Sequence, residues 1–373
     1  MRYFLVAGEA SGDLHASNLM AQIKEHDSDA DFMFFGGDLM QAQGGVMLKH
    51  YREMAYMGLF EVIANIGKVK ANFKLCKQKL LEYNPDAFIL VDYPGFNLRM
   101  AEFAHEHHIK TFYYISPKIW AWKKKRAYKV KKFIDKMFVI FPFEVEFYKQ
   151  FDYKVEYVGN PLIDAMRLKE KDIMPKEQFF EKYNIKKPVI ALVPGSRKSE
   201  IKYILPEMLK VMPHFEQYKF IICGAPSIPK DYYKEIIGSN NVELIFDQTY
   251  TIVKHAVAAV VASGTATLET AFLNTPQVVC YKFMPLSYTV ASPFIKVKYF
   301  SLVNIILNKP AVKEILQYKL DTQIIEELRS ILFNDLYAER MLNDYRQIHS
   351  ILGNGSASQA TAKRIVEILK NNN

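Results

Sequence analysis

The chain has 373 residues, more than one hydrophobic core usually holds, so we expect two domains. Half of the residues are apolar and 24% are charged, which excludes a disordered chain, while a net charge of +9 favours nucleic acid, an anionic membrane surface or a phosphorylated substrate as partner. The three cysteines, Cys76, Cys223 and Cys280, are far apart and odd in number, which argues against a disulfide framework and indicates a reducing, cytoplasmic setting.

The first half of the chain alternates short apolar runs with amphipathic stretches. Its first run soon gives way to glycine and acidic residues, which indicates a strand and not a signal peptide, and no run of about 18 apolar residues predicts a transmembrane helix. The predicted strands are residues 3–7, 31–35, 87–91, 111–115 and 136–140, and the predicted helices are residues 15–25, 66–82 and 98–107. Strands that are apolar throughout are typical of a parallel sheet covered by helices on both faces, so we expect a doubly wound α/β domain.

The same pattern restarts after a polar stretch at residues 164–187. Its predicted strands are residues 189–193, 219–222, 242–245, 258–261 and 277–281, and residues 336–373 are predicted to be helical. The fold class is therefore α/β, with two successive Rossmann-like domains that face a cleft. Ligands of such sheets bind at the carboxyl ends of the strands, so functional residues should directly follow strands.

The sequence Gly-Glu-Ala-Ser-Gly-Asp at residues 8–13 follows the first predicted strand and opens a helix. Glycines there allow a tight turn close to a ligand. Glu9 and Asp13 would repel a pyrophosphate, and together with the hydroxyl of Ser11 they suit a sugar better. A helix cap formed by Ser11 or Asp13 explains the same residues equally well.

Asp92 ends another apolar strand and is followed by Tyr93, Pro94 and Gly95. A carboxylate at the end of a strand can remove a proton from a sugar hydroxyl as a general base. Burial beside Tyr93 and Phe96 would raise the pKa of Asp92 and strengthen this interpretation. The alternative is an acidic turn residue or a cap of the next helix, and we favour catalysis.

A third candidate, the sequence Ser-Pro-Lys-Ile-Trp-Ala-Trp at residues 116–122, also follows a strand. Trp120 and Trp122 are the two tryptophans of the chain, and the densest positive charge lies beside them. The basic residues are Lys118, Lys123, Lys124, Lys125, Arg126, Lys129, Lys131 and Lys132. Cations mixed with large aromatic side chains are typical of an interface with anionic lipid, although nucleic acid can use the same mixture.

Two further motifs follow strands of the second half and lead into helices. Pro-Gly-Ser-Arg at residues 194–197 offers backbone amides and the forked guanidinium of Arg197 to a phosphate. Ser-Gly-Thr at residues 263–265 leaves a helix N-terminus open to a pyrophosphate, and Glu269, one turn on, could hold ribose hydroxyls. Each alone is more often a helix cap, but together they favour a nucleotide-diphosphate site. Asn304 could bond a sugar or a phosphate, or form a turn.

No group of His, Cys, Asp and Glu residues has the spacing of metal ligands, so we predict no metal and no cofactor. Taken in order, the six motifs resemble those of the lipid-A-disaccharide synthases over nearly the whole chain. They are Gly8-Glu-Ala-Ser-Gly-Asp13, the strand end at Asp92, Ser116-Pro-x-x-Trp-Ala-Trp122, Pro194-Gly-Ser-Arg197, Ser263-Gly-Thr-Ala266 with Glu269, and Ser301-Leu-x-Asn304.

This resemblance implies a GT-B fold whose C-terminal helices cross back to the first domain. The implied domains are residues 1–164 with helices 349–373, for acceptor and catalysis, and residues 165–348, for the UDP-sugar. The implied reaction is an inverting transfer from UDP-2,3-diacylglucosamine to 2,3-diacylglucosamine 1-phosphate, which gives a β-1,6-linked disaccharide 1-phosphate and UDP without a metal. Members of the family are peripheral proteins of the cytoplasmic face of the inner membrane, some are homodimers, and no nucleic-acid partner is expected.

The resemblance also assigns roles to residues. Asp92 is similar to the proposed base, with Glu9 and Asp13 as competitors, because Gly95 stands where other members commonly have a second Asp. The implied UDP and phosphate residues are Gly195, Ser196, Arg197, Ser263, Gly264, Thr265, Glu269 and Asn304. The expected acceptor and membrane residues are Ser11, Trp120, Trp122, Lys123, Lys124 and Arg126.

Three alternatives stay open. Another GT-B enzyme with a lipid-linked acceptor, such as the N-acetylglucosamine transferase of peptidoglycan synthesis, carries a more glycine-rich first loop with a histidine. A UDP-sugar 2-epimerase has a similar architecture but no need of the basic tryptophan stretch. A nucleic-acid-binding module at residues 118–132 would bind in a salt-dependent way that ignores UDP.

Overall fold

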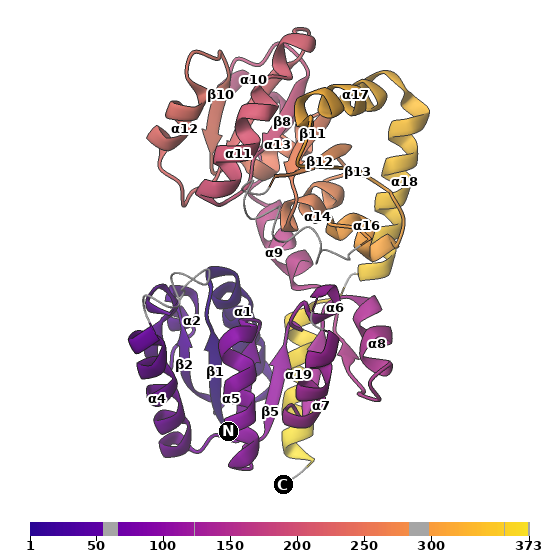
Figure 1. Ribbon diagram of the computed structural model, residues 1–373. Coiled ribbons are helices and arrows are strands. Elements are labelled where there is room, and N and C mark those ends of the chain that lie inside the picture. Colours follow the sequence, from indigo (N-terminus) through magenta and orange to yellow (C-terminus); the bar gives the residue numbers. More distant parts are fainter. Residues whose placement is uncertain (55–65, 123, 283–297, 354, 372–373) are drawn as a thin grey trace. The chain divides into compact units, whose positions relative to one another are not determined.

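The computed structural model describes residues 1–54, 66–122, 124–282, 298–353 and 355–371. The chain forms two compact units (Figure 1). Unit 1 comprises Met1–Asp164 and Leu352–Asn373, and unit 2 comprises Ala165–Ile351. In the described part of the chain, no helix has both the length and the apolar character needed to cross a bilayer.

The sheet of unit 1 is parallel and, over the described residues, has seven strands in the order β3-β2-β1-β4-β5-β6-β7. The strands are β1 (Arg2–Ala7), β2 (Asp31–Gly36), β3 (Val46–His50), β4 (Ala87–Val91), β5 (Thr111–Tyr114), β6 (Lys136–Val139) and β7 (Glu156–Tyr157). The helices are α1 (Ala10–His26), α2 (Asp38–Ala42), η1 (Tyr51–Glu53), α4 (Ile66–Tyr83), α5 (Pro94–Glu106), α6 (Ile119–Trp122), η2 (Lys124–Arg126), α7 (Ala127–Phe133), α8 (Pro142–Lys149), α9 (Pro161–Glu170), which crosses into unit 2, and α19 (Ala357–Lys370).

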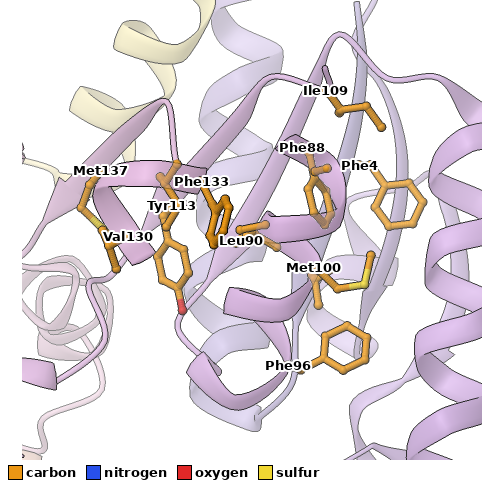
Figure 2. Close-up of a cluster of buried hydrophobic side chains, with 14 of the residues drawn as sticks. Phe4, Phe88, Leu90, Phe96, Met100, Ile109, Tyr113, Val130, Phe133 and Met137 are labelled. Atoms are coloured by element: carbon orange, nitrogen blue, oxygen red, sulfur yellow. The ribbon is translucent and has the colours of Figure 1, made fainter. Parts of the chain in front are cut away.

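Alternate residues of the buried strands supply the two faces of this sheet, and each face has its own core. Figure 2 shows one core, in which Phe4, Phe88 and Leu90 of the sheet pack with Phe96 and Met100 of α5. The other core joins the opposite face to α1 and α19. The predicted doubly wound domain is confirmed.

The last helix of the chain, α19, belongs to the core of the first unit. Figure 1 shows it in yellow among the purple elements of unit 1. Its residues Ala362, Ile365 and Val366 are buried together with α1 and the central strands. The side chain of Asp164 accepts hydrogen bonds from Ser356 Oγ (3.1 Å) and the Ser358 amide (3.2 Å), which fixes the start of the helix.

We expect Ile365→Ala to lower the free energy of unfolding of unit 1 by about 2–5 kcal/mol, because a fully buried side chain leaves a cavity between α1 and the sheet. Trp120 and Trp122 both lie in unit 1, so urea titration followed by tryptophan fluorescence measures this loss. Lys363→Ala, at an exposed position of the same helix, should change stability by less than about 0.5 kcal/mol. Equal effects of both changes would contradict the packing of α19 on unit 1.

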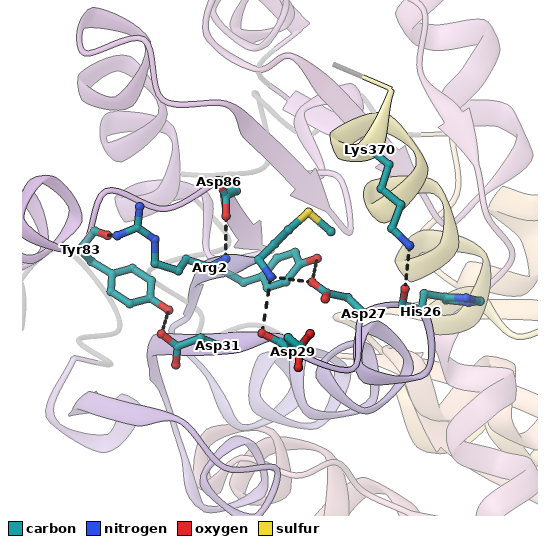
Figure 3. Close-up of polar contacts among 10 residues, drawn as sticks. Arg2, His26, Asp27, Asp29, Asp31, Tyr83, Asp86 and Lys370 are labelled. Atoms are coloured by element: carbon teal, nitrogen blue, oxygen red, sulfur yellow. Dashed lines mark hydrogen bonds and ion pairs between the residues drawn. The ribbon is translucent and has the colours of Figure 1, made fainter. Parts of the chain in front are cut away.

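Polar contacts fasten the edge of the sheet where β1 and β2 begin (Figure 3). Asp27 accepts hydrogen bonds from the N-terminal amine (3.0 Å) and from Tyr3 Oη (2.8 Å). The Arg2 amide donates to Asp86 Oδ2 at 2.7 Å, and Lys370 Nζ reaches the His26 carbonyl at 3.2 Å. These contacts lie at the amino ends of the strands. The loops at the carboxyl ends of the strands are therefore the ones available for a functional site.

Unit 2 repeats the architecture with a parallel sheet that, among its described residues, has six strands in the order β10-β9-β8-β11-β12-β13. The strands are β8 (Val189–Val193), β9 (Lys219–Gly224), β10 (Glu243–Phe246), β11 (Ala258–Ala262), β12 (Gln277–Tyr281) and β13 (Lys313–Leu316). The helices are α10 (Lys176–Lys182), α11 (Lys198–Leu209), η3 (Met212–His214), α12 (Lys230–Ile237), α13 (Thr249–His255), α14 (Thr265–Phe272), α16 (Leu302–Leu307), α17 (Leu320–Phe333) and α18 (Asp335–Leu352).

Candidate functional site

The carboxyl ends of three neighbouring strands bring the predicted acidic residues of unit 1 together. The register pairs Val91 of β4 with Ala7 of β1 on one side and with Tyr114 of β5 on the other. The loops that follow these strands therefore lie side by side. They carry Glu9 after β1 and Asp92 after β4.

The backbone at Asp92 is held in a turn that side chains rarely tolerate. Asp92 and Tyr93 both have φ of 45°, in the left-handed region, which costs about 1–3 kcal/mol for each residue. The Asp92 carbonyl accepts hydrogen bonds from Asn97 Nδ2 (2.8 Å) and from the hydroxyl of Tyr113, and its amide donates to the Tyr114 carbonyl (3.1 Å). The buried surroundings thus impose the turn that presents the carboxyl group of Asp92.

The carboxyl group of Asp92 is half-buried, and this burial raises its pKa to about 6. The positive charge of Lys118, from the loop after β5, acts in the opposite direction, and the negative charge of Glu9 adds to the rise. A carboxyl group with this pKa is mostly ionised at neutral pH yet basic enough to accept a proton from a hydroxyl group.

Gly8 is required by the aromatic ring that follows Asp92. A methyl group on Gly8 would lie 2.3 Å from Cδ1 of Tyr93, which is too close for any atoms not bonded to each other. The Tyr93 hydroxyl donates a hydrogen bond of 2.9 Å to the Met54 carbonyl. The first glycine of the 8–13 motif therefore makes room for Tyr93 beside the proposed base.

Asp13 has a structural task in this unit. Its buried carboxylate accepts hydrogen bonds from the amides of Gly37 (2.8 Å), Leu39 (3.1 Å) and Met40 (3.1 Å) at the start of α2. Glu9 differs, because it is the residue before α1 and its half-buried side chain makes no capping hydrogen bond. The alternative of a capping role for Asp13 is the one that the geometry favours, although the helix it caps is α2 and not α1.

A buried carboxyl group that the sequence did not reveal lies under the loop after β5. Glu144 accepts hydrogen bonds from the amides of Ile140 (3.1 Å) and Phe141 (3.0 Å), and burial raises its pKa to about 7. Ser116 Oγ, at the start of the loop, lies 2.9 Å from Tyr148 Oη. Pro at the first and Glu at the third position of a helix form a recognisable start signal, but Phe141 in place of a Ser or Thr cap concealed it.

The basic residues after this loop form an exposed surface on η2 and α7. Trp120 packs edge-on against Phe143, with ring centroids 5.0 Å apart, and Trp122 ends α6. Lys123 lies outside the described residues, Arg126 is half-buried and Ser11 is exposed on α1. We call the exposed residues the basic surface; they are Lys124, Lys125, Tyr128, Lys129, Lys131 and Lys132.

In unit 2 the loop after β8 is already bound to an acidic side chain. Gly195 has φ of +110°, and a Cβ there would lie 2.5 Å from Glu200 Oε2. That oxygen accepts hydrogen bonds from the amides of Ser196 (3.0 Å) and Arg197 (3.2 Å), and Arg197 Nη1 lies 3.3 Å from Glu200 Oε1. The two amides that were expected to face a phosphate thus bond Glu200, whereas the Arg197 side chain remains 61% exposed.

The neighbouring strand β11 leads into the Ser-Gly-Thr motif. Ser263 bonds the main chain on both sides, through its amide to Cys280 (2.8 Å) and through Oγ to the carbonyl of Phe300 (3.3 Å). Gly264 precedes α14, and Thr265 is its first residue; both are exposed. Since β8 and β11 are adjacent in the sheet, this helix start and the Arg197 loop follow adjacent strands.

Glu269 lies one turn into α14, where burial raises the pKa of its carboxyl group. Oε1 accepts a hydrogen bond of 2.7 Å from the hydroxyl of Tyr250, a residue of α13 that sequence reasoning did not single out. A lone tyrosine in a helix gives no sequence signal for such a role.

Asn304 is engaged on both sides of its amide. Nδ2 donates to the Val312 carbonyl and to Glu314 Oε1, both at 2.9 Å, and Oδ1 accepts from the Val312 amide at 2.9 Å. Glu314 also accepts hydrogen bonds from the amides of Phe300 and Ser301. The structure therefore gives Asn304 the task of fastening the start of α16 to β13, and its expected contact with a sugar or phosphate stays a prediction.

The described ranges contain no group of three or more His, Cys, Asp or Glu side chains that could hold a metal ion. The candidate site of unit 1 is thus a half-buried carboxyl group with two charged neighbours. That of unit 2 consists of an exposed arginine, a helix start and a half-buried glutamate.

Comparisons of the sequence with known proteins agree on one family. A family model described as lipid-A-disaccharide synthetase matches residues 3–366. The chain is 32% identical to the lipid-A-disaccharide synthase of Geobacter sulfurreducens, over 99% of this chain and 97% of that one. It is 36% identical to lipid-A-disaccharide synthase 1 of Legionella pneumophila (strain Philadelphia 1), over 100% and 98%. The solved structure of a UDP-GlcNAc 2-epimerase from Neisseria meningitidis bound to UDP-GlcNAc is similar with a TM-score of 0.63 and 14% identity over the whole of both chains, which shows the GT-B fold.

Proposed function

Because the chain belongs to the family of lipid-A-disaccharide synthases, glycosyltransferases that make the lipid A disaccharide, we propose that it joins two acylated glucosamines by an inverting transfer. The donor is UDP-2,3-diacylglucosamine and the acceptor is 2,3-diacylglucosamine 1-phosphate. The products are the β-1,6-linked disaccharide 1-phosphate and UDP.

The observation that carries this proposal is the environment of Asp92. Its carboxyl group follows β4 in an imposed left-handed turn, and its pKa is raised to about 6 by burial. In the proposed step the 6-hydroxyl oxygen of the acceptor attacks C1 of the donor sugar, and Asp92 takes the hydroxyl proton. The bond from C1 to the phosphate oxygen breaks, and UDP leaves with the electron pair.

The donor residues are those of unit 2. The negative charge that develops on the leaving UDP needs positive partners, and we assign the exposed guanidinium of Arg197 and the start of α14 at Thr265 to this task. We assign Glu269 to the ribose hydroxyls, because a carboxylate can accept the hydrogen bonds that these hydroxyls donate. No metal ion enters this mechanism.

Both proposed substrates carry acyl chains, so the enzyme must work at a membrane surface. We assign contact with the cytoplasmic face of the inner membrane to the basic surface of η2 and α7, because each exposed Lys near an anionic bilayer contributes about 1 kcal/mol.

We expect the triple change Lys124→Glu, Lys125→Glu and Lys129→Glu to reduce sedimentation with phosphatidylglycerol vesicles by more than about tenfold. The same sites changed to Gln should show a smaller loss, and 1 M salt should release the wild-type protein. Unchanged vesicle binding by the Glu variant would exclude this surface.

The function itself is tested by incubating the purified chain with both proposed substrates in detergent with EDTA. Mass spectrometry should detect the disaccharide 1-phosphate and UDP in equal amounts, and NMR should show a β linkage. A folded protein that makes no disaccharide contradicts the proposal. UDP-GlcNAc with a lipid-linked peptidoglycan acceptor, and UDP-GlcNAc alone, then test the transferase and epimerase alternatives.

A further inference from the structure

Two residues from two helices of unit 2 converge on the carboxylate of Glu269, which a third helix carries. Tyr250 Oη, from α13, donates a hydrogen bond of 2.7 Å to Oε1 of Glu269, from α14. Lys169 Nζ, from α9, lies 5.3 Å from the centroid of the Tyr250 ring and attracts the charge of Glu269. The three side chains therefore form one connected group.

This group orients the carboxyl group of Glu269 and opposes part of the effect of burial on its pKa. Burial opposes ionisation of the carboxyl group, while the Tyr250 hydrogen bond and the charge of Lys169 favour it. Burial also raises the pKa of the Tyr250 hydroxyl, so this group stays protonated and acts as a donor to Oε1. With Oε1 occupied, the rotation of the carboxylate is fixed and Oε2 is the oxygen left to accept from a ligand.

The pair also lines a small hollow at the proposed donor site. Tyr250 and Glu269 share it with Val193, the last residue of β8, and with Ala266, in the first turn of α14. The remaining lining residues are Thr249, Val253, Thr270 and Leu273. The hollow thus lies between α13 and α14, beside the last residue of β8, the strand that leads to Arg197, and the first turn of α14, which is assigned to the diphosphate.

We propose that Tyr250 is a positioning residue that aims Glu269 at a ribose hydroxyl of the donor nucleotide, so that the pair selects ribonucleotides over their deoxy forms. This inference rests on the proposed function, because it assumes that unit 2 binds UDP. It adds Tyr250 to that site, together with a preference for ribonucleotides over deoxyribonucleotides. A merely structural bond between α13 and α14 would leave this selectivity unchanged.

The test measures the affinity of the full chain for UDP, 2′-deoxy-UDP and 3′-deoxy-UDP by calorimetry. The wild type should prefer UDP over at least one of the deoxy forms by about tenfold or more, as expected for a hydroxyl group bonded to a carboxylate. Tyr250→Phe should weaken UDP binding by about fivefold and leave the affinity for that deoxy form nearly unchanged, so that the preference largely disappears. Glu269→Gln should lose the preference as well.

Tyr337→Phe is the matched control. Tyr337 Oη donates to Glu327 Oε1 at 2.5 Å, so this change removes a second tyrosine–carboxylate hydrogen bond from unit 2, away from the site. It should cost a similar amount of thermal stability but keep the preference for UDP. If Tyr250→Phe retains the wild-type preference, or if the wild type shows none while binding UDP, the inference is overturned. Failure of the wild type to bind any of the three nucleotides overturns the proposed donor site and this inference with it.

Discussion

We expect Asp92→Asn to lower kcat by about 10²- to 10⁴-fold, the usual contribution of a positioned general base. Asparagine keeps the size of the side chain and the main-chain hydrogen bonds of the turn, but it cannot accept the proton of the acceptor hydroxyl. Disaccharide formation under saturating substrates measures the loss, and UDP binding by calorimetry should be unchanged. A variant that keeps more than a tenth of the wild-type rate would exclude Asp92 as the base and turn attention to Glu9.

The same change should not weaken the fold. Burial raises the pKa of Asp92 above the value of an unfolded chain, so ionising it costs stability as the pH rises from about 4 through about 6. Asp92→Asn removes that cost, and its melting temperature at pH 7.5 should equal or exceed that of the wild type. Loss of activity together with retained or increased stability is typical of a residue that serves function at a cost in stability.

The pH dependence of kcat/KM gives a second measure of Asp92. The rate should be full at neutral pH and fall about tenfold per unit below a pH of about 6, as the base becomes protonated. Lys118→Met removes a positive charge that lowers the pKa of Asp92, so the fall in kcat/KM should begin at a higher pH. Glu9→Gln removes a negative charge that raises this pKa, so the fall should begin at a lower pH. Lys149→Met, at an exposed position of α8, serves as the control and should not shift this pH dependence.

The largest loss of stability should follow Asp13→Ala, at about 3–5 kcal/mol in unit 1. The change leaves the amides of Gly37, Leu39 and Met40 without their acceptor. Urea unfolding followed by tryptophan fluorescence measures it. Asp13→Asn should lose less, because one amide oxygen can still accept from Gly37 and Met40, which both bond Oδ1.

Glu25→Ala is the control for Asp13, since it removes an exposed acidic side chain from the same helix. It should change stability by less than about 0.5 kcal/mol. An Asp13→Ala protein that melts like the wild type but makes no disaccharide would contradict the structural role and place Asp13 in the chemistry.

The buried strands could be predicted from the sequence, and of the four edge strands only β10 could. All ten predicted strands are present, because a run such as Ala87–Val91 is buried on every side and must be apolar throughout. The strands β3, β7 and β13 were missed. Each lies at the edge of its sheet, and Val46–His50 and Lys313–Leu316 carry charged or exposed residues that break the apolar pattern.

The position of the candidate residues after strands could be predicted, but the contacts that these residues make could not. Short motifs after strands led to Asp92, Arg197 and Glu269, since parallel strands collect their carboxyl ends at one edge. The sequence could not show that Glu200 binds the amides beside Arg197 or that Asn304 bonds Val312, because those contacts depend on how loops fold back. The fold alone does not identify the activity, because a UDP-GlcNAc 2-epimerase shares this architecture at 14% sequence identity.

The place of α19 has a consequence for the order in which a newly made chain can fold. A ribosome releases the second unit, Ala165–Ile351, before it releases Ala357–Lys370. The core that needs Ile365 and Val366 therefore stays open during translation, although most of its strands are synthesised first. The first unit therefore cannot complete its core before the second unit has been synthesised, so the usual rule that N-terminal domains fold first does not apply to it. A nascent chain stalled before residue 357 would expose the apolar face of the first sheet and become a natural client of chaperones.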